Sequence, residues 1–468
     1  MDTSTAPVSQ EGEGHLEHRF SRLTMIGLTF GILNTWICLA GSLGIVMPSG
    51  SSVSFLYGFV FCVICNLCLS ASVGELSSIR PTAGGQYHYA AFFAAQFISA
   101  AAVVGSDGAY EITPWKTYLI FLGVSTFTVL LNIFGYRILN RWNEFALFWS
   151  VLGCIVVSIT ILATGKKTSA KHVFTNFTNS TGWSDGMAWI LGLLQSALSL
   201  IGFDAPQRDA PQAMVAAVGI GGTTGNLFIL VMLFSLVDVD AILSTNTNVS
   251  VTEMIYQATR SRAAAVVLSC ALAICFVNGT NGCVTSGSRL LWAMARDNGS
   301  PFSKFLSHIT PGLNVPMRAI LAAAVFNMLF GLLYLGPTVA FNAYCASCTI
   351  FLNMSYAIPV TILLLCGRKL VNKNRPVFFL GHIVGYVVNW TSVLFFFCFP
   401  RFLPVDASTM NYVAAVVGIF LIFATGLWLA KRGQYNGPQF EIILGEDVLA
   451  ATPAIEAAKG GMEHREQV

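Results

Sequence analysis

The stretch that decides the fold is "LTMIGLTFGILNTWICLAGSLGIVMPSG", residues 23–50. It is long and apolar enough to cross the hydrocarbon core of a bilayer, about 30 Å thick, as a helix. Glycine recurs along it, and Asn34 and Thr35 stand near its middle. Glycine weakens a helix, and the two polar side chains supply hydrogen-bond partners at depth. The stretch therefore predicts a membrane helix whose centre can unwind.

Similar stretches recur along the chain, which is 468 residues long with 55% hydrophobic and 10% charged residues. A soluble domain carries about a quarter charged residues. We expect twelve spans, at residues 24–47, 54–74, 89–106, 117–136, 145–164, 187–204, 213–236, 263–284, 317–336, 340–365, 379–400 and 409–430. In lipid only helices and closed β-barrels satisfy every backbone group, and the alternating pattern of barrel strands is missing from this sequence. We therefore expect the fold class of an all-α membrane protein.

Charge placement gives the orientation of these spans. Most Lys and Arg residues fall in the loops that are cytoplasmic when both termini are cytoplasmic, which agrees with the positive-inside rule. We therefore expect a multi-pass protein of the plasma membrane, with a transmembrane domain at 23–432 between cytoplasmic tails at 1–22 and 433–468. The net charge of +3 reflects this topology and predicts no nucleic-acid partner; the partner is the lipid bilayer.

Catalytic and metal-binding constellations are not recognisable in the sequence. The histidines are scattered, and no paired carboxylates or nucleophile motif is found. The twelve cysteines lie within or at the ends of apolar stretches without His or carboxylate neighbours, so they are read as small packing residues. We predict no enzyme, no metal and no cofactor.

A second break is predicted at "SLIGFDAPQRDAP", residues 199–211, where the sixth span ends in Ser199, Gly202 and Asp204. The sixth span comes five positions after the first, which is the offset of a five-plus-five inverted repeat followed by two further helices. The alternative is that the helix simply reaches the cytoplasm there. Just downstream, "GIGGTTG" (219–225) lacks the context of a phosphate loop, and we read Gly221 and Gly225 as a close helix contact.

Several blocks resemble the fungal amino acid/choline/GABA permeases of the amino acid–polyamine–organocation superfamily. They are "FSRLTMIGLTFGILNTW" (20–36), "GELSSIRPTAGGQYHYAA" (74–91), "GIGGTTG", "SGSRLLWAMARDNGSPFSKFL" (286–306), "VPMRAI" (315–320) and "MNY" (410–412). The resemblance runs from about Arg19 to Pro438. It implies a LeuT-type fold and a secondary transporter that imports a small amino or quaternary-ammonium compound by alternating access, with protons as coupling ion.

The resemblance also implies the site residues. A substrate would lie between the unwound middles of spans one and six, lined by Gly31, Asn34, Thr35, Trp36, Ser199, Gly202, Phe203 and Asp204. Helix ends would meet a carboxylate, and Trp36 or Phe203 could face an ammonium group, although packing is the simpler role for each aromatic. A cytoplasmic gate would use Glu75, Arg80, Gly84 and Gly85, for which the alternative is a tight loop with a local Glu–Arg pair.

Two departures from the family pattern stand against this picture. Compared with the family pattern, this chain lacks about ten residues near 204–208, and its third span is short near 96–107. Either gap would weaken the site, so the alternative function is a non-transporting sensor or a degenerate permease.

Overall fold

The computed structural model describes residues 22–77, 89–135, 138–200, 202, 210–245, 247, 249–313, 315–336, 338–365, 380, 385, 387–388 and 413–433. Within these ranges the regular elements are all helical, as expected. They are α1 (Arg22–Leu33), α2 (Thr35–Val46), α3 (Ser51–Ser77), α4 (Tyr89–Gly105), α5 (Pro114–Phe134), α6 (Leu139–Thr164), α7 (Ala170–Thr175), α8 (Asp185–Leu198), α9 (Ala210–Ser235), α10 (Val239–Leu243), α11 (Ser250–Thr259), α12 (Arg262–Arg296), α13 (Ser303–Leu306), α14 (Met317–Gly331), the short 3-10 helix η1 (Leu332–Leu335), α15 (Thr338–Leu365) and α18 (Val413–Lys431).

Seven helical stretches in the described part of the chain are long and apolar enough to cross a membrane. Three more apolar helices are shorter, namely Ala90–Gly105, Phe351–Leu365 and Ala415–Lys431. Most of the twelve expected spans coincide with helices. The span expected at 379–400 lies largely outside the described residues. The twelve-span arrangement and its inverted repeat therefore stay predictions.

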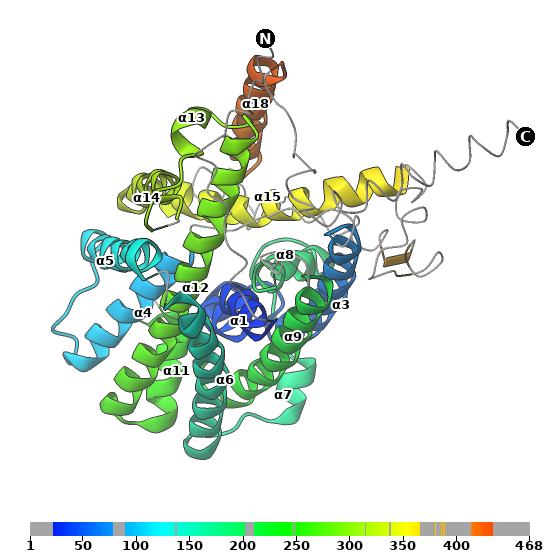
Figure 1. Ribbon diagram of the computed structural model, residues 1–468. Helices are drawn as coiled ribbons and strands as arrows, with labels where there is room; N and C mark the ends of the chain where they lie inside the picture. The colour runs from blue at the N-terminus through cyan, green and yellow to red at the C-terminus, as the bar shows by residue number, and fades with distance from the viewer. Residues whose placement is uncertain are drawn as a thin grey trace, which may run out of the picture.

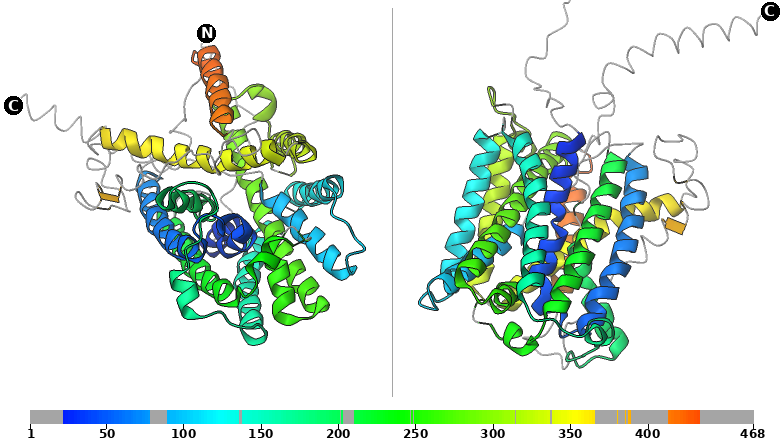
Figure 2. Two further views of the ribbon diagram at one scale, coloured as in Figure 1. Left: turned by 180° about the vertical axis from the view of Figure 1, so that it is seen from behind. Right: turned by 90° about the horizontal axis from the view of Figure 1, so that it is seen from below.

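The first expected span lies at the centre of the bundle (Figure 1), and it is two helices instead of one. Helix α1 contacts α6, α9 and α12, while α2 contacts α8, α9 and α11. Viewed from below, α6, α1, α9 and α3 run alongside one another (Figure 2). Trp36, Ile37 and Leu39 have no exposed surface, whereas Ile422 on the peripheral α18 is 76% exposed. The apolar core and the apolar outer surface together fit a bundle immersed in lipid.

The third expected span is α4, and with 17 residues it is indeed short. It ends in a turn in which Asp107 and Gly108 have φ values of 59° and 79°. The carboxylate of Asp107 pairs with Arg262 at the start of α12 at 2.5 Å. The ion pair ties the end of α4 to α12, along which α4 packs.

Candidate functional site

The break in the first span is at Asn34. This residue has φ 41° and ψ 42°, the left-handed conformation that asparagine tolerates better than most residues. Its backbone N–H donates to Phe30 O at 2.8 Å, and its carbonyl accepts from the N–H groups of Ile37 and Cys38 at 3.2 and 3.1 Å. The two helices are thus joined through one non-helical residue, which confirms that this span is interrupted at its middle.

The side chain of Asn34 is bound to two other helices. Its Nδ2 donates to the carbonyl of Cys275 on α12 at 3.0 Å, and its Oδ1 accepts from the Ser150 hydroxyl on α6 at 3.3 Å. An asparagine at this position ordinarily caps the following helix, but here it makes no side-chain bond to α2. The first-turn N–H groups of α2 are therefore not capped by this side chain.

Ser150 links both sides of the break, and sequence reasoning missed it. Its Oγ accepts from Trp36 Nε1 at 2.9 Å and donates to Asn34 Oδ1 at 3.3 Å. Most hydroxyls inside membrane helices bond to a carbonyl of their own helix, as Thr160 does to Val156 O on α6 at 2.7 Å. Ser150 is 2% exposed, and its bonds connect α6 with α2.

Trp36 is occupied by packing. Its ring meets Phe228 of α9 edge-on at a centroid distance of 5.1 Å, and a Cβ added at Gly153 would lie 3.5 Å from it. Its indole N–H is bound to Ser150. The contacts support the packing role for this aromatic in the described conformation.

Thr35 points toward the glycines of α9. A Cβ added at Gly221 would lie 2.5 Å from Thr35 Oγ1, and one at Gly225 would lie 2.7 Å from Phe59 Cζ and 3.0 Å from Thr35 Cγ2. The close helix contact predicted from "GIGGTTG" is therefore confirmed. The Thr35 hydroxyl is buried without a hydrogen-bond partner.

Gly31 borders open space among the described residues. It is buried, yet no heavy atom lies within 4 Å of the position that a Cβ would take. Its carbonyl faces α12, where a Cβ added at Gly279 would lie 3.1 Å away. Gly31 and Asn34 thus lie together beside α12, and their predicted role in binding a substrate stays a prediction.

The second predicted break is described only in part. Helix α8 ends at Leu198, the Ser199 hydroxyl donates to Ser196 O at 2.8 Å, and Gly202 has φ 103°, which favours glycine. Phe203 and Asp204 lie outside the described residues, as does the suspected deletion at 204–208. Their place in the site stays a prediction.

Glu75 does not lie in a loop, where the sequence placed it. It belongs to the last turn of α3 and is fully buried. Its Oε1 accepts from the backbone N–H of Leu380 at 3.0 Å. Arg80, Gly84 and Gly85, the other predicted gate residues, lie outside the described residues. Neither the gate nor the local Glu–Arg pair is therefore tested.

A cluster of buried amides on α5 and α12 also escaped sequence reasoning. Asn132 Nδ2 donates to Asn281 Oδ1 at 2.8 Å, and the Thr285 hydroxyl donates to Asn132 Oδ1 at 2.6 Å. These bonds fix α5 against α12. The sequence held one signal for this cluster, namely two asparagines three residues apart, Asn278 and Asn281, on one apolar helix.

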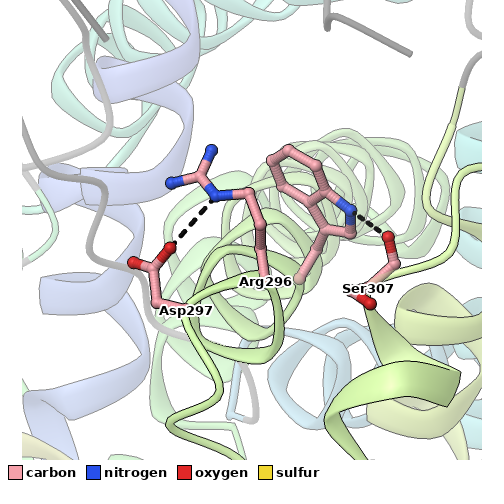
Figure 3. Close-up of polar contacts among 4 residues, drawn as sticks. Arg296, Asp297 and Ser307 are labelled. Carbon is pink, nitrogen blue, oxygen red and sulfur yellow. Dashed lines mark hydrogen bonds and ion pairs between the residues drawn. The ribbon is translucent and has the colours of Figure 1, made fainter. Parts of the chain in front are cut away.

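The "SRLLWAMARDNG" block forms the end of α12 and its turn. Figure 3 shows Arg296 directed at the carboxylate of Asp297, at 3.1 Å, and Ser307 accepting at 2.9 Å from the indole of Trp292. The Arg296 guanidinium also lies 5.2 Å from the Trp292 ring centroid. The Trp292–Ser307 bond attaches the end of α12 to the α13 segment.

Comparison with known proteins agrees with this architecture. Residues 90–425 match the family described as "Amino acid permease". The chain is 32% identical to a choline transporter of Saccharomyces cerevisiae, covering 92% of this chain and 84% of that protein. It is 25% identical to a GABA-specific permease of the same yeast (90% and 83%) and 26% identical to an amino-acid permease of Arabidopsis thaliana (94% and 99%).

The alignment with the choline transporter carries one further fact. It runs over 481 positions, more than the 468 residues of the whole chain. The yeast protein therefore has residues, within the aligned region, for which this chain has no counterpart.

Proposed function

Because the chain belongs to the amino acid permease family of membrane transporters and not to a family of enzymes, we propose that it is a secondary active transporter. It imports a small amino compound, such as an amino acid, GABA or choline, by alternating access. We place it in the plasma membrane with both termini in the cytoplasm, on the strength of the Lys and Arg distribution.

The observation that carries the proposal is the uncapped start of α2 at the break. The side-chain amide of Asn34 is bound to Cys275 and Ser150 and does not cap α2, and the Asn34 carbonyl accepts from the N–H groups of Ile37 and Cys38. The N–H groups of Thr35 and Trp36, at the very start of α2, receive no bond from Asn34 and are the ones that could meet another acceptor. A helix N-terminus carries a partial positive charge, and an anion there gains about 0.3–1 kcal/mol, or up to ~2 kcal/mol when partly buried. Gly31 leaves room beside the same break. These features favour a substrate with a carboxylate.

The case for a quaternary-ammonium substrate rests on a relative and not on the geometry of the break. A yeast relative is a choline transporter, but the Trp36 ring is packed against Phe228 and Gly153. A choline head group would therefore have to find its aromatic partner elsewhere, for example at Phe203. Between the two classes, the described geometry ranks an amino acid or GABA first.

Proton coupling is proposed on the position of one carboxylate. Glu75 is fully buried in α3 and holds the backbone N–H of Leu380, more than 300 residues away. An ionisable side chain inside a membrane bundle commonly marks an ion or proton pathway. Replacing Glu75 with glutamine should make uptake less dependent on the pH gradient across reconstituted liposomes.

The second candidate function is a non-transporting sensor or degenerate permease. It is favoured by the 481-position alignment and by the shortness of α4 and α8, which have 17 and 14 residues. Such a protein would bind a small amino compound without carrying it across.

Uptake by the unmodified chain separates the two candidates. Yeast cells without their own choline, GABA and general amino acid permeases would express the chain with a surface tag. Saturable uptake of labelled GABA, choline or an amino acid supports transport. Normal surface level and ligand binding without uptake would establish the second candidate instead.

A further inference from the structure

Asn278, in the middle of α12, is a buried amide with unused hydrogen-bonding capacity. It is 5% exposed, and neither its Oδ1 nor its Nδ2 has a hydrogen-bond partner among the residues that the structure describes. Of the amides nearby, Asn34 bonds to Cys275 O and Asn132 bonds to the Oδ1 of Asn281, whose Nδ2 has no partner among the described residues. Asn278 differs in that both of its side-chain polar atoms lack one. Buried polar groups are nearly always paired, and polar side chains inside a membrane usually mark a functional site. Asn278 therefore has a buried amide that a ligand could bind.

The neighbours of Asn278 show where its side chain leaves the helix. Cys275 and Gly279 face the break, since Cys275 O accepts from Asn34 and a Cβ at Gly279 would lie 3.9 Å from Asn34 Nδ2. Asn281 faces α5 through its bond from Asn132. Successive residues turn by about 100° around a helix, so position 278 lies between these two directions. Asn278 is therefore directed between the first span and α5, on the face where α6 also packs, since Ala271, two turns earlier, accepts from Trp149 of α6 at 3.3 Å.

The surroundings restrict the kind of ligand. Between Arg262 and Arg289, α12 carries no charged residue, and Arg22 and Lys116 are the charged residues of α1 and α5. A neutral amide offers two N–H donors and one oxygen acceptor. It suits a ligand oxygen, either a hydroxyl or a carboxylate, better than a bare ammonium group.

We propose that Asn278 binds the oxygen-bearing group of the substrate and selects for compounds that have one. The proposal rests on the proposed function for the identity of the ligand, but it concerns binding and does not require transport. It predicts discrimination between GABA and butylamine, which lacks the carboxylate, and between choline and ethyltrimethylammonium, which lacks the hydroxyl.

The test measures ligand binding to the detergent-purified full-length chain by the shift in melting temperature over a titration. The variants are Asn278→Ala and Asn278→Leu. The matched control is Thr280→Val, on the opposite face of the same helix, where the hydroxyl is buried and bonds only to Phe276 O at 2.8 Å. Loss of one hydrogen bond to a neutral donor should weaken binding of GABA or choline about three- to tenfold.

Binding of butylamine or ethyltrimethylammonium should stay the same in the Asn278 variants, so the preference for GABA and choline over these analogues falls by the same three- to tenfold, while Thr280→Val keeps it. Unchanged GABA and choline affinity in Asn278→Ala, together with a higher melting temperature of Asn278→Leu, would show that the amide holds only water and would overturn the proposal. Absence of binding by the unmodified protein to all four compounds would overturn it as well. Binding without uptake refutes the transport proposal alone.

Discussion

Replacing Ser150 with alanine tests whether the break is held by its hydrogen bonds to α6. The substitution removes one oxygen, which leaves Trp36 Nε1 without the acceptor at 2.9 Å and Asn34 Oδ1 without the donor at 3.3 Å. It adds no atoms and leaves the ring contact of Trp36 with Phe228 in place. The variant should therefore fold, with a break that is less well fixed.

The expected magnitude follows from these two bonds. A buried group that loses its partner costs about 1–3 kcal/mol, whereas interhelical hydrogen bonds in a membrane bundle average about 0.6 kcal/mol. The 3.3 Å bond is the weaker of the two. We expect the described conformation to become less stable by about 1–2 kcal/mol. If transport depends on that conformation, uptake kcat/KM falls about tenfold.

The assay pairs uptake with a structural readout. Thr160→Val is the control on the same helix, because Thr160 bonds only to its own helix at Val156 O. A cysteine placed at Gly31, where space exists, should react faster with a membrane-permeant thiol reagent in the Ser150→Ala background. The double variant with Trp36→Phe should lose less than the sum of the single variants, since both remove the same bond. Unchanged uptake, melting temperature and cysteine reactivity in Ser150→Ala would refute the reasoning.

Three further predictions follow from the same contacts. Thr35→Val should keep uptake and surface level, because the Thr35 hydroxyl has no partner in the described structure; loss of uptake with normal surface level would instead make Thr35 a ligand contact. Gly225→Ala should destabilise the protein by about 1–3 kcal/mol through overpacking, since its Cβ would lie 2.7 Å from Phe59 Cζ, and this should lower the melting temperature and the surface level. Gly219→Ala on the same helix is the control, because its Cβ meets no atom within 4 Å. Equal behaviour of the two variants would contradict this reasoning. Tags on both termini should resist protease added to intact cells, and cleavage of either tag would show that the orientation is wrong.

The interruption of the first span was predictable from the sequence, but the partners of its residues were not. Glycines and polar residues in an apolar stretch signal a weak point in a helix. Asn34, Thr35 and Trp36 are consecutive, so their side chains leave the chain in different directions. One meets α12 and α6, the next meets α9, and the third meets α6 and α9. Only the packing of helices distant in sequence decides which of them can face a ligand.

Helix α12 shows a second limit of prediction from the sequence. Average hydropathy predicts a span at 263–284, but the helix continues to Arg296. The extension carries Trp292, whose bond to the Ser307 carbonyl forms only when the following segment folds back. Within the span, the many apolar neighbours of Asn278 and Asn281 keep the mean hydropathy high, so the average does not reveal these two buried amides.

The glycines of α9 have a consequence for how the molecule can move. Gly221 and Gly225 bring that helix so near to Thr35 and Phe59 that no side-chain atom fits between them. Surfaces that interlock in this way cannot slide past one another without separating, so α2, α3 and α9 travel as a single piece. On its other side the break is attached by hydrogen bonds to Ser150 and Cys275, which can open and re-form. An opening between this piece and the pair α6 and α12 would have to break these bonds and also separate Gly27 of α1 from α6, where an added Cβ would lie 2.8 Å from the Asn143 carbonyl. A cross-link across that boundary should slow the cycle more than one placed toward α9.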